Sequence, residues 1–344
     1  MNNFFNLIKS FLILCCVTLL MVPISYAQLS GIKTIPGDYA TIQLAIADLN
    51  TQGVGSGGVT FNIASGYSES ISFPFILTAT GTASNPIIFQ KNGVGANPLI
   101  TRIDLGTVTT STLGGQGDAV IIIQGSDYLT FDAIDVAASD QGIEYGYYLR
   151  KASDTDGCKF VTIKNAAISM AKGTSAFVTG IYSSNNDTAS TASSATGITV
   201  TSVGGRNENV TITGNTIGNV FAGIVLRGFN HTTVPYDFYD QNFLVGANGA
   251  GNIIQNYAGN TAATTYGVYL IYHNNASVSY NTINNVAGGG SSATSILYGI
   301  FNSTGTLSTF NANNNIINVT TSATASAIYG INNAGTGNLS VDNN

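Results

Sequence analysis

The chain has little charge. Charged residues make up 8% of its 344 residues, against roughly a quarter in an average globular domain. Only three of them are glutamates, Glu69, Glu144 and Glu208, whereas the exposed faces of helices are usually rich in charged side chains. Glycine (40 residues), Asn, Thr and Ser supply the polarity instead. This composition disfavours a helical protein and favours many short strands joined by tight turns.

Basic residues and cysteine are also scarce. The few Lys and Arg residues are scattered singly in a chain of net charge −6. Because nucleic-acid binding needs a basic patch that neutralises phosphates, we expect no nucleic-acid partner. Two of the three cysteines, Cys15 and Cys16, lie near the start of the chain, which leaves Cys158 alone further on. We expect the segment that contains Cys15 and Cys16 to be cleaved as a signal peptide. The mature protein then has no internal disulfide and must draw its stability from repetitive burial.

The first 27 residues are typical of a secretory signal peptide. Lys9 supplies a positive charge, residues 11–22 form an apolar run, and Ser25 and Ala27 place small residues before Gln28. The apolar run is too short to span a bilayer comfortably, and no later run could do so. We therefore expect residues 1–27 to be cleaved, the protein to be secreted or on the cell surface, and no transmembrane span to remain.

Two sequence markers recur along the chain. The first is apolar-x-apolar, two residues, Asn, one residue and apolar, at residues 210–217, 276–283 and 310–317; residues 129–136 and 161–168 keep its frame without the Asn. The second is a Gly before an apolar or aromatic residue and usually after Tyr. Its glycines are Gly146, Gly180, Gly223, Gly267, Gly299 and Gly330. Both markers repeat with a period of about 30 residues, which indicates stacked structural repeats.

Each repeat predicts three short strands. Apolar residues at alternate positions turn one face of a strand inward. The Asn tolerates the left-handed backbone that the turn after it needs, and the Tyr-Gly-Ile segment supplies a third strand. Coils stacked about 4.8 Å apart can also pair their Asn amides from coil to coil. Since no helical pattern separates the copies, we predict an all-β protein, a right-handed parallel β-helix over residues 59–344.

One helix is predicted, close to the start of the mature chain. Residues 41–50 follow a cluster of turn residues and place four apolar side chains on one face. These are Ile42, Ala45, Ile46 and Leu49. The open end of a β-helix presents unpaired strand edges that would recruit other chains. We therefore expect residues 28–58 to form an N-terminal cap, with this helix over the open end.

Several stretches carry a resemblance to known families. Residues 38–43 (Asp-Tyr-Ala-Thr-Ile-Gln) and 58–63 (Gly-Val-Thr-Phe-Asn-Ile) resemble the entry of pectin-lyase-like right-handed β-helix proteins, above all the opening of pectin esterases. Residues 85–91 and 125–132 resemble segments of large surface β-helix repeat proteins of Bacteroidetes-type bacteria, which glide and degrade polysaccharides. The resemblance implies the fold. In pectin esterases, catalysis rests on an Asp pair, glutamines and an Arg. The later coils of this chain contain no match for that set. We interpret residues 66–69 as a coil corner with one exposed Glu.

The end of the sequence continues the repeat. Val341 and Asn344 fall on the same frame as Val278 and Asn281, so another strand should follow. The bacterial surface proteins that this chain resembles continue into further modules and a sorting domain. We therefore expect the repeats over residues 59–344 to be the front part of a longer protein whose C-terminal modules are missing from this sequence.

Residues 127–140 hold the densest run of carboxylates: Asp127, Asp132, Asp135 and Asp140. Asp132 and Asp135 flank a turn between two strands and should point outward, close to each other. The resemblance implies that such groups bind Ca²⁺ in lyases or act as an acid and base pair in hydrolases. The next coil offers Lys164 and Asn165 but no acid, so solvated turn acids are the favoured interpretation. Asp132 and Asp135 are weak catalytic candidates, and no cofactor is predicted beyond this Ca²⁺ alternative.

An insertion between Gly228 and Asn248 breaks the repeat. It gathers aromatic residues, acids and one of only two histidines, and loops on a rigid scaffold are where function concentrates. Flat rings beside carboxylates and amides suit the faces and hydroxyls of sugars. The candidate ligand-binding residues are His231, Tyr236, Asp237, Phe238, Tyr239 and Asp240. The alternative is an aromatic plug that packs the loop onto the flank of the β-helix. His231 and His273 are too far apart in the repeat frame for one metal site.

These observations do not assign an activity. The leading hypothesis is a non-enzymatic secreted or cell-surface module that binds polysaccharide or cell-surface glycan, or serves as an adhesive stalk. One alternative is a polysaccharide lyase, hydrolase or esterase that acts in a groove along the coils. That alternative gains support if Asp132, Asp135 and a basic residue line one cleft. A further alternative is a spacer without a ligand.

Overall fold

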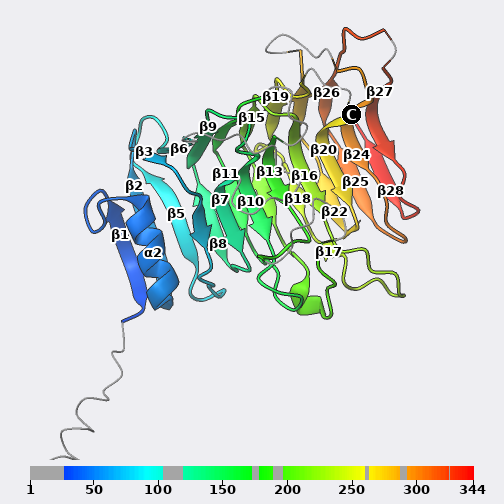
Figure 1. The fold of residues 1–344 in the computed structure, drawn as a ribbon. Coiled ribbons are helices and arrows are strands. Elements are labelled where there is room, and N and C mark those ends of the chain that lie inside the picture. The colour runs from blue at the N-terminus through cyan, green and yellow to red at the C-terminus, as the bar shows by residue number, and fades with distance from the viewer. Residues whose placement is uncertain are drawn as a thin grey trace, which may run out of the picture.

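Three long parallel sheets wind into a right-handed parallel β-helix (Figure 1). The computed structural model describes residues 27–103, 119–172, 178–188, 197–259, 263–286, 293–324 and 326–344. All of the predicted signal peptide except Ala27 lies outside these residues. No helix in the described ranges has the length and apolar character that a membrane crossing requires. The predicted fold class is confirmed.

Each complete coil contributes one strand to each of the three sheets, while β1 and β28 at the two ends extend sheet A alone. Sheet A contains β1 (Leu29–Ile35), β2 (Val54–Ala64), β5 (Ile87–Asn92), β8 (Leu129–Asp132), β11 (Thr162–Lys164), β14 (Thr211–Thr213), β18 (Leu244–Val245), β22 (Ala276–Val278), β25 (Phe310–Asn313) and β28 (Leu339–Asp342). Sheet B contains β3 (Ser68–Ile71), β6 (Leu99–Arg102), β9 (Asp135–Ala138), β12 (Ala167–Ser169), β15 (Thr216–Gly218), β19 (Ile253–Gln255), β23 (Thr282–Asn284) and β26 (Ile316–Asn318).

Sheet C completes each coil. It contains β4 (Phe75–Leu77), β7 (Ala119–Gln124), β10 (Tyr145–Arg150), β13 (Thr179–Ser183), β16 (Ala222–Arg227), β20 (Thr265–Ile271), β24 (Leu297–Asn302) and β27 (Ile328–Asn333). A separate parallel pair joins β17 (Asp240–Gln241) to β21 (His273–Asn274). A short 3-10 helix, η1, spans Val203–Gly205.

The Gly marker lies in sheet C for a steric reason. A Cβ on Gly223 would lie 2.6 Å from Ile254 Cγ2 and 2.5 Å from the carbonyl oxygen of Gly267 in the next coil. The glycines at 146, 180, 267 and 299 meet the same two kinds of neighbour. Isoleucine side chains of sheet B therefore pack directly against the backbone of sheet C, and only glycine leaves the room that they need.

The Asn marker forms a hydrogen-bond ladder that is buried except at its last member, Asn344, and it confirms the predicted pairing of amides. Its members, in order along the β-helix, are Asn215, Asn252, Asn281, Asn315 and Asn344. In the middle of the ladder, the side-chain amide of Asn252 donates to Asn281 Oδ1 at 2.9 Å, and its backbone N–H donates to the same oxygen at 3.1 Å. A second donor bond reaches the Ile212 carbonyl at 2.8 Å. Each buried amide is thus satisfied by its neighbours, as a low-dielectric interior requires.

The cap differs in part from the prediction. Helix α2 spans Ile42–Gln52 and buries the four predicted apolar residues, with Thr41 as its N-cap. Figure 1 shows this helix at one end of the β-helix beside β1. Strand β1 comes before the helix and already pairs in parallel with β2, so sheet A begins at Leu29 and not at residue 59. Glu69, expected at an exposed corner, accepts the backbone N–H groups of Ile42 and Gln43 at 2.7 and 3.2 Å and stabilises the N-terminus of the helix.

The Asn ladder predicts a large loss of stability for Asn252→Ala. This change leaves Asn215 N–H and the Ile212 carbonyl without their buried partners, at about 1–3 kcal/mol for each group. We expect the free energy of unfolding to fall by about 3 kcal/mol. Equilibrium chemical denaturation followed by circular dichroism measures it. The exposed Asn318 provides the control, because Asn318→Ala should change stability by less than about 0.5 kcal/mol. Equal effects of the two substitutions would contradict a structural role for the ladder.

Candidate functional site

The insertion forms a self-packed loop between β16 and β17. We name residues 228–239 the aromatic loop; it projects near the label β17 in Figure 1. The His231 ring stacks on the Phe238 ring with centroids 4.3 Å apart, and the Phe229 ring lies 6.2 Å from the His231 ring. The Phe238 N–H donates to His231 Nδ1 at 3.2 Å. All three of these side chains are partly exposed, so the loop presents a preformed aromatic surface.

A second ring stack ties the loop to the β-helix. The Tyr236 ring lies 5.7 Å from the Tyr239 ring, which in turn lies 5.8 Å from the Tyr272 ring. Tyr239 is only 3% exposed, and its hydroxyl accepts the Thr306 N–H at 3.1 Å. Burial raises the pKa of this phenol. Tyr239 therefore anchors the loop, while the half-buried Tyr236 lies at its surface.

Asp240, the first residue after the loop, lies inside the protein. Its side chain is fully buried, and its Oδ1 accepts from Lys151 Nζ at 3.0 Å and from the Asn207 N–H at 2.8 Å. The sequence placed Asp240 and Tyr239 among the ligand-binding residues. The structure gives both of them a fixing role, because the chain re-enters the coil stack at β17 immediately after the loop. The predicted residues that remain accessible are His231, Tyr236, Asp237 and Phe238.

A polar strip borders the aromatic loop. Arg206 donates from Nη1 to the Asp237 carbonyl at 2.8 Å and pairs with Glu208 at 3.0 Å. Gln241 Nε2 donates to Glu208 Oε1 at 3.0 Å. Burial alone would raise the pKa of Glu208, but the bonds from Arg206 and Gln241 outweigh it and lower the pKa. Glu208 is therefore ionised at neutral pH and holds Arg206 against the loop.

The acidic segment forms a polar cleft at the turn between β8 and β9. The cleft has a volume of about 410 Å³ and is lined by Gln90, Lys91, Asn97, Asp132, Ala133 and Asn165. Asp132 accepts from Asn165 Nδ2 at 2.7 Å and pairs with Lys164 Nζ at 3.0 Å. One predicted catalytic candidate thus shares a cleft with a basic residue, Lys91.

Asp135, the other candidate, lies beside this cleft and does not line it. Its Oδ1 accepts from Asn97 Nδ2 at 2.8 Å and from the Ala167 N–H at 2.7 Å. Asp132 and Asp135 therefore face different partners across the turn. Both carboxylates accept hydrogen bonds from neighbouring coils.

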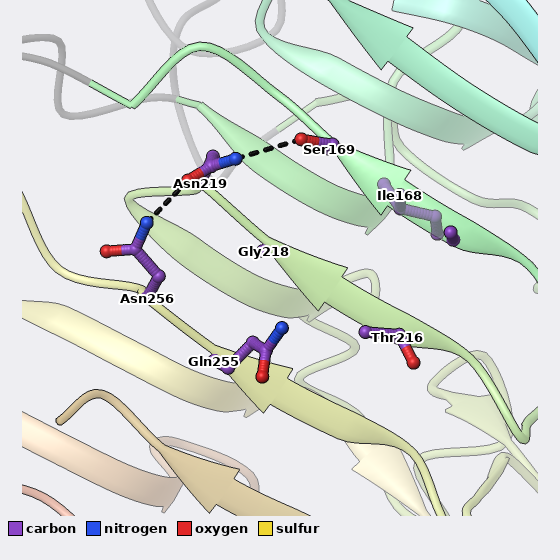
Figure 2. Close-up of a pocket in the computed structure, with 8 residues that line it drawn as sticks. Ile168, Ser169, Thr216, Gly218, Asn219, Gln255 and Asn256 are labelled. Carbon is purple, nitrogen blue, oxygen red and sulfur yellow. Dashed lines mark hydrogen bonds between the residues drawn. The ribbon is translucent and has the colours of Figure 1, made fainter. Parts of the chain in front are cut away.

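A shallow hollow on the outer face of sheet B had no counterpart in the sequence prediction (Figure 2). Its volume is about 250 Å³, and it crosses β12, β15 and β19. Gly218 stands in register with Ser169 of the coil before it and, without a side chain, lowers the floor. Figure 2 shows the hydrogen bonds at its edge, from Asn256 to Asn219 and from Asn219 to Ser169. The sequence feature that could have predicted this hollow is Gly218, a lone glycine in an outward-facing column of larger residues.

The described residues bring no three His, Cys, Asp or Glu side chains close enough together to hold a metal ion. His231 lies in the aromatic loop, and His273 is buried in β21. The two histidines make different contacts, the first with Phe238 and the second with Phe243.

No protein-family model and no curated protein matches this sequence. Among solved structures, an alginate lyase from Paenibacillus sp. str. FPU-7 is 14% identical with a TM-score of 0.36, over 84% of this chain and 97% of that one. The surface protein and adhesin PfbA of Streptococcus pneumoniae is 14% identical with a TM-score of 0.27, over 92% and 98%. The GH136 lacto-N-biosidase from Eubacterium ramulus is 10% identical with a TM-score of 0.30, over 86% and 64%. At such low identities and TM-scores, these likenesses assign neither an activity nor a ligand.

The two tyrosines of the loop should respond differently to truncation. Tyr239→Ala removes a buried ring and should lower the free energy of unfolding by about 3–5 kcal/mol. Tyr236→Ala removes a half-buried ring from the surface and should cost about 1 kcal/mol or less. Thermal unfolding of both variants, followed by circular dichroism, checks this difference. A loss for Tyr236→Ala as large as that for Tyr239→Ala would show that the whole loop is a structural plug.

Proposed function

We propose that this chain is a secreted or cell-surface β-helix module that binds a polysaccharide or cell-surface glycan without cleaving it. The observation that carries this proposal is the aromatic loop, whose partly exposed rings are held in place by a buried anchor. The proposed ligand-contacting residues are His231, Tyr236, Asp237 and Phe238. The predicted signal peptide supports the extracellular location.

Sugar recognition fits the chemistry of this surface. The faces of sugar rings carry C–H groups that pack on aromatic side chains, and their hydroxyls pair with carboxylates and amides. Asp237 is exposed and lies in the chain between Tyr236 and Phe238. Because Tyr239 and Arg206 already fix the loop, a ligand would lose little free energy to ordering it.

The uncharged hollow of Figure 2 offers further groups on sheet B that can hydrogen-bond to sugar hydroxyls. Its edge carries the side-chain amides of Asn219, Gln255 and Asn256 together with the hydroxyl of Ser169. Such groups both donate and accept hydrogen bonds, as sugar hydroxyls do. We propose this hollow as an accessory contact for a long glycan chain, secondary to the aromatic loop.

A polysaccharide panel tests the binding proposal. The wild-type protein should bind at least one glycan, and the double variant Tyr236→Ala/Phe238→Ala should bind it at least about tenfold more weakly, a loss of about 1.4 kcal/mol. Affinity electrophoresis or a glycan array gives the comparison. The matched control is Phe73→Ala, since Phe73 is 77% exposed and lies between β3 and β4, away from the loop. Unchanged binding by the double variant, or binding to no glycan at all, would overturn the proposal.

Polysaccharide cleavage in the polar cleft is the second candidate function. The specific observation that favours it is that Lys91 and Asp132 line the same cleft. In such an enzyme Asp132 would accept or deliver a proton, and Lys91 would stabilise negative charge on the substrate. The ion pair of Asp132 with Lys164 argues against this role, because the proton-accepting oxygen is already engaged.

An activity screen separates the two functions. Under the binding proposal, incubation of the protein with pectins, alginates and related polymers, with and without Ca²⁺, releases no new chain ends. Ultraviolet absorbance and a reducing-end assay measure such release. Activity that falls about a hundredfold or more in Asp132→Asn, and persists in the exposed control Asp342→Asn, would replace the binding proposal with the second candidate.

A further inference from the structure

A cluster of ionisable groups lies inside the β-helix, next to the end of the aromatic loop. Lys151 Nζ is 3.0 Å from Asp240 Oδ1, and both side chains are 0% exposed. His273 is 1% exposed and Asn207 is 0% exposed. Removing an ion pair from water costs several kcal/mol for each ion, and an apolar pair of the same size would avoid that cost. The pair places an amine in direct contact with a carboxyl group in a dry site.

Two atoms of the cluster have no hydrogen-bond partner among the described residues: Asp240 Oδ2 and His273 Nε2. Strands β17 and β21 place Asp240 and His273 directly in register as neighbours. His273 Nδ1 lies 2.9 Å from the Ile271 carbonyl. Because a carbonyl only accepts hydrogen bonds, the ring proton of the neutral imidazole is on Nδ1. Nε2 then carries a free lone pair on the residue that stands in register with Asp240.

Asn207 completes the cluster as a fixed hydrogen-bond donor. Its backbone N–H donates to Asp240 Oδ1 at 2.8 Å. Its own side chain is held on both sides, since Oδ1 accepts the Cys158 N–H at 2.9 Å and Nδ2 donates to Ser183 Oγ at 3.1 Å. A rigid donor aimed at this oxygen stabilises the negative charge that develops there when a nucleophile attacks the carboxyl carbon.

We propose that Lys151 and Asp240 condense to form an intramolecular amide bond, with Asn207 and His273 assisting the reaction. The ion pair first becomes neutral by loss of a proton from Nζ to the carboxylate, which holds it on Oδ2. Lys151 Nζ then attacks Asp240 Cγ, and the Asn207 N–H stabilises the negative charge on Oδ1. His273 Nε2 takes a proton from Nζ and delivers it to Oδ2, which leaves as water. One C–N bond forms, one C–O bond breaks, and no oxidant or cofactor is required.

The amide would join the segment after β10 to β17, on different coils of the β-helix. Beyond the signal peptide this chain carries a single cysteine, Cys158, which is buried and unpaired. A cross-link between side chains would supply the covalent reinforcement that a disulfide gives in other exported proteins. It would also secure the end of the aromatic loop, and it does not depend on the redox state of the surroundings.

Mass spectrometry of the denatured wild-type protein tests the proposal directly. We expect a mass lower than the sequence mass of the mature chain by one water molecule, and a branched proteolytic peptide that joins Lys151 to Asp240. Lys151→Arg cannot form the amide and should show its full sequence mass. The exposed pair Lys164–Asp132, with the same 3.0 Å separation, is the internal control and should stay unlinked. A wild-type protein of full mass, with Lys151 and Asp240 in separate peptides, would overturn the proposal even if the variants fail to fold.

The role of His273 has its own test. In His273→Gln, we expect the cross-linked fraction to grow about a hundredfold more slowly after refolding, with the secondary structure retained by circular dichroism. The wild-type rate should depend on pH through the imidazole, and this dependence should vanish in the variant. Cross-linking of His273→Gln at the wild-type rate, with the same pH dependence, would show that His273 does not relay the proton.

Discussion

Stacking in register is the constraint on which the rest of this structure depends. Coils lie about 4.8 Å apart, so every inward side chain meets its equivalent in the coils before and after it. A buried amide is stable in that setting only when the next coil offers a matching amide, as Asn252 finds in Asn281. Likewise, the Ile254 side chain fits only because Gly223 leaves space in sheet C. Repetition in the sequence is therefore a direct consequence of the packing.

This constraint explains what could be predicted from the sequence. The alternating apolar residues, the Asn column and the Tyr-Gly-Ile marker all report contacts between equivalent positions, and all three lie where expected. Asn252 was missed because the turn between β18 and β19 is longer than in the other coils, which hides the repeat. Strand β1 was missed because only its first and last residues, Leu29 and Ile35, are buried. The role of Glu69 at the N-terminus of helix α2 was missed as well, because its hydrogen bond with Ile42 joins segments far apart in the chain.

The candidate site was less predictable, since it departs from the repeat. The sequence identified the insertion as unusual, but it could not show which of its side chains turn inward. Tyr239 and Asp240 are buried because the chain must return to the coil stack, and their contacts with Thr306 and Lys151 come from remote segments. The same contacts that remove these residues from the surface hold Tyr236 and Phe238 on it. The burial of Tyr239 and Asp240 is thus linked to the partial exposure of the residues just before them.

Hydrogen–deuterium exchange of the intact protein with a bound glycan shows whether the aromatic loop contacts the glycan, because it locates contact without altering the chain. If the loop binds the glycan, we expect slowed exchange of backbone amides in residues 228–239 and no change in the cleft segment 129–135. Protection confined to residues 129–135 and 162–167, with the aromatic loop unaffected, would contradict it.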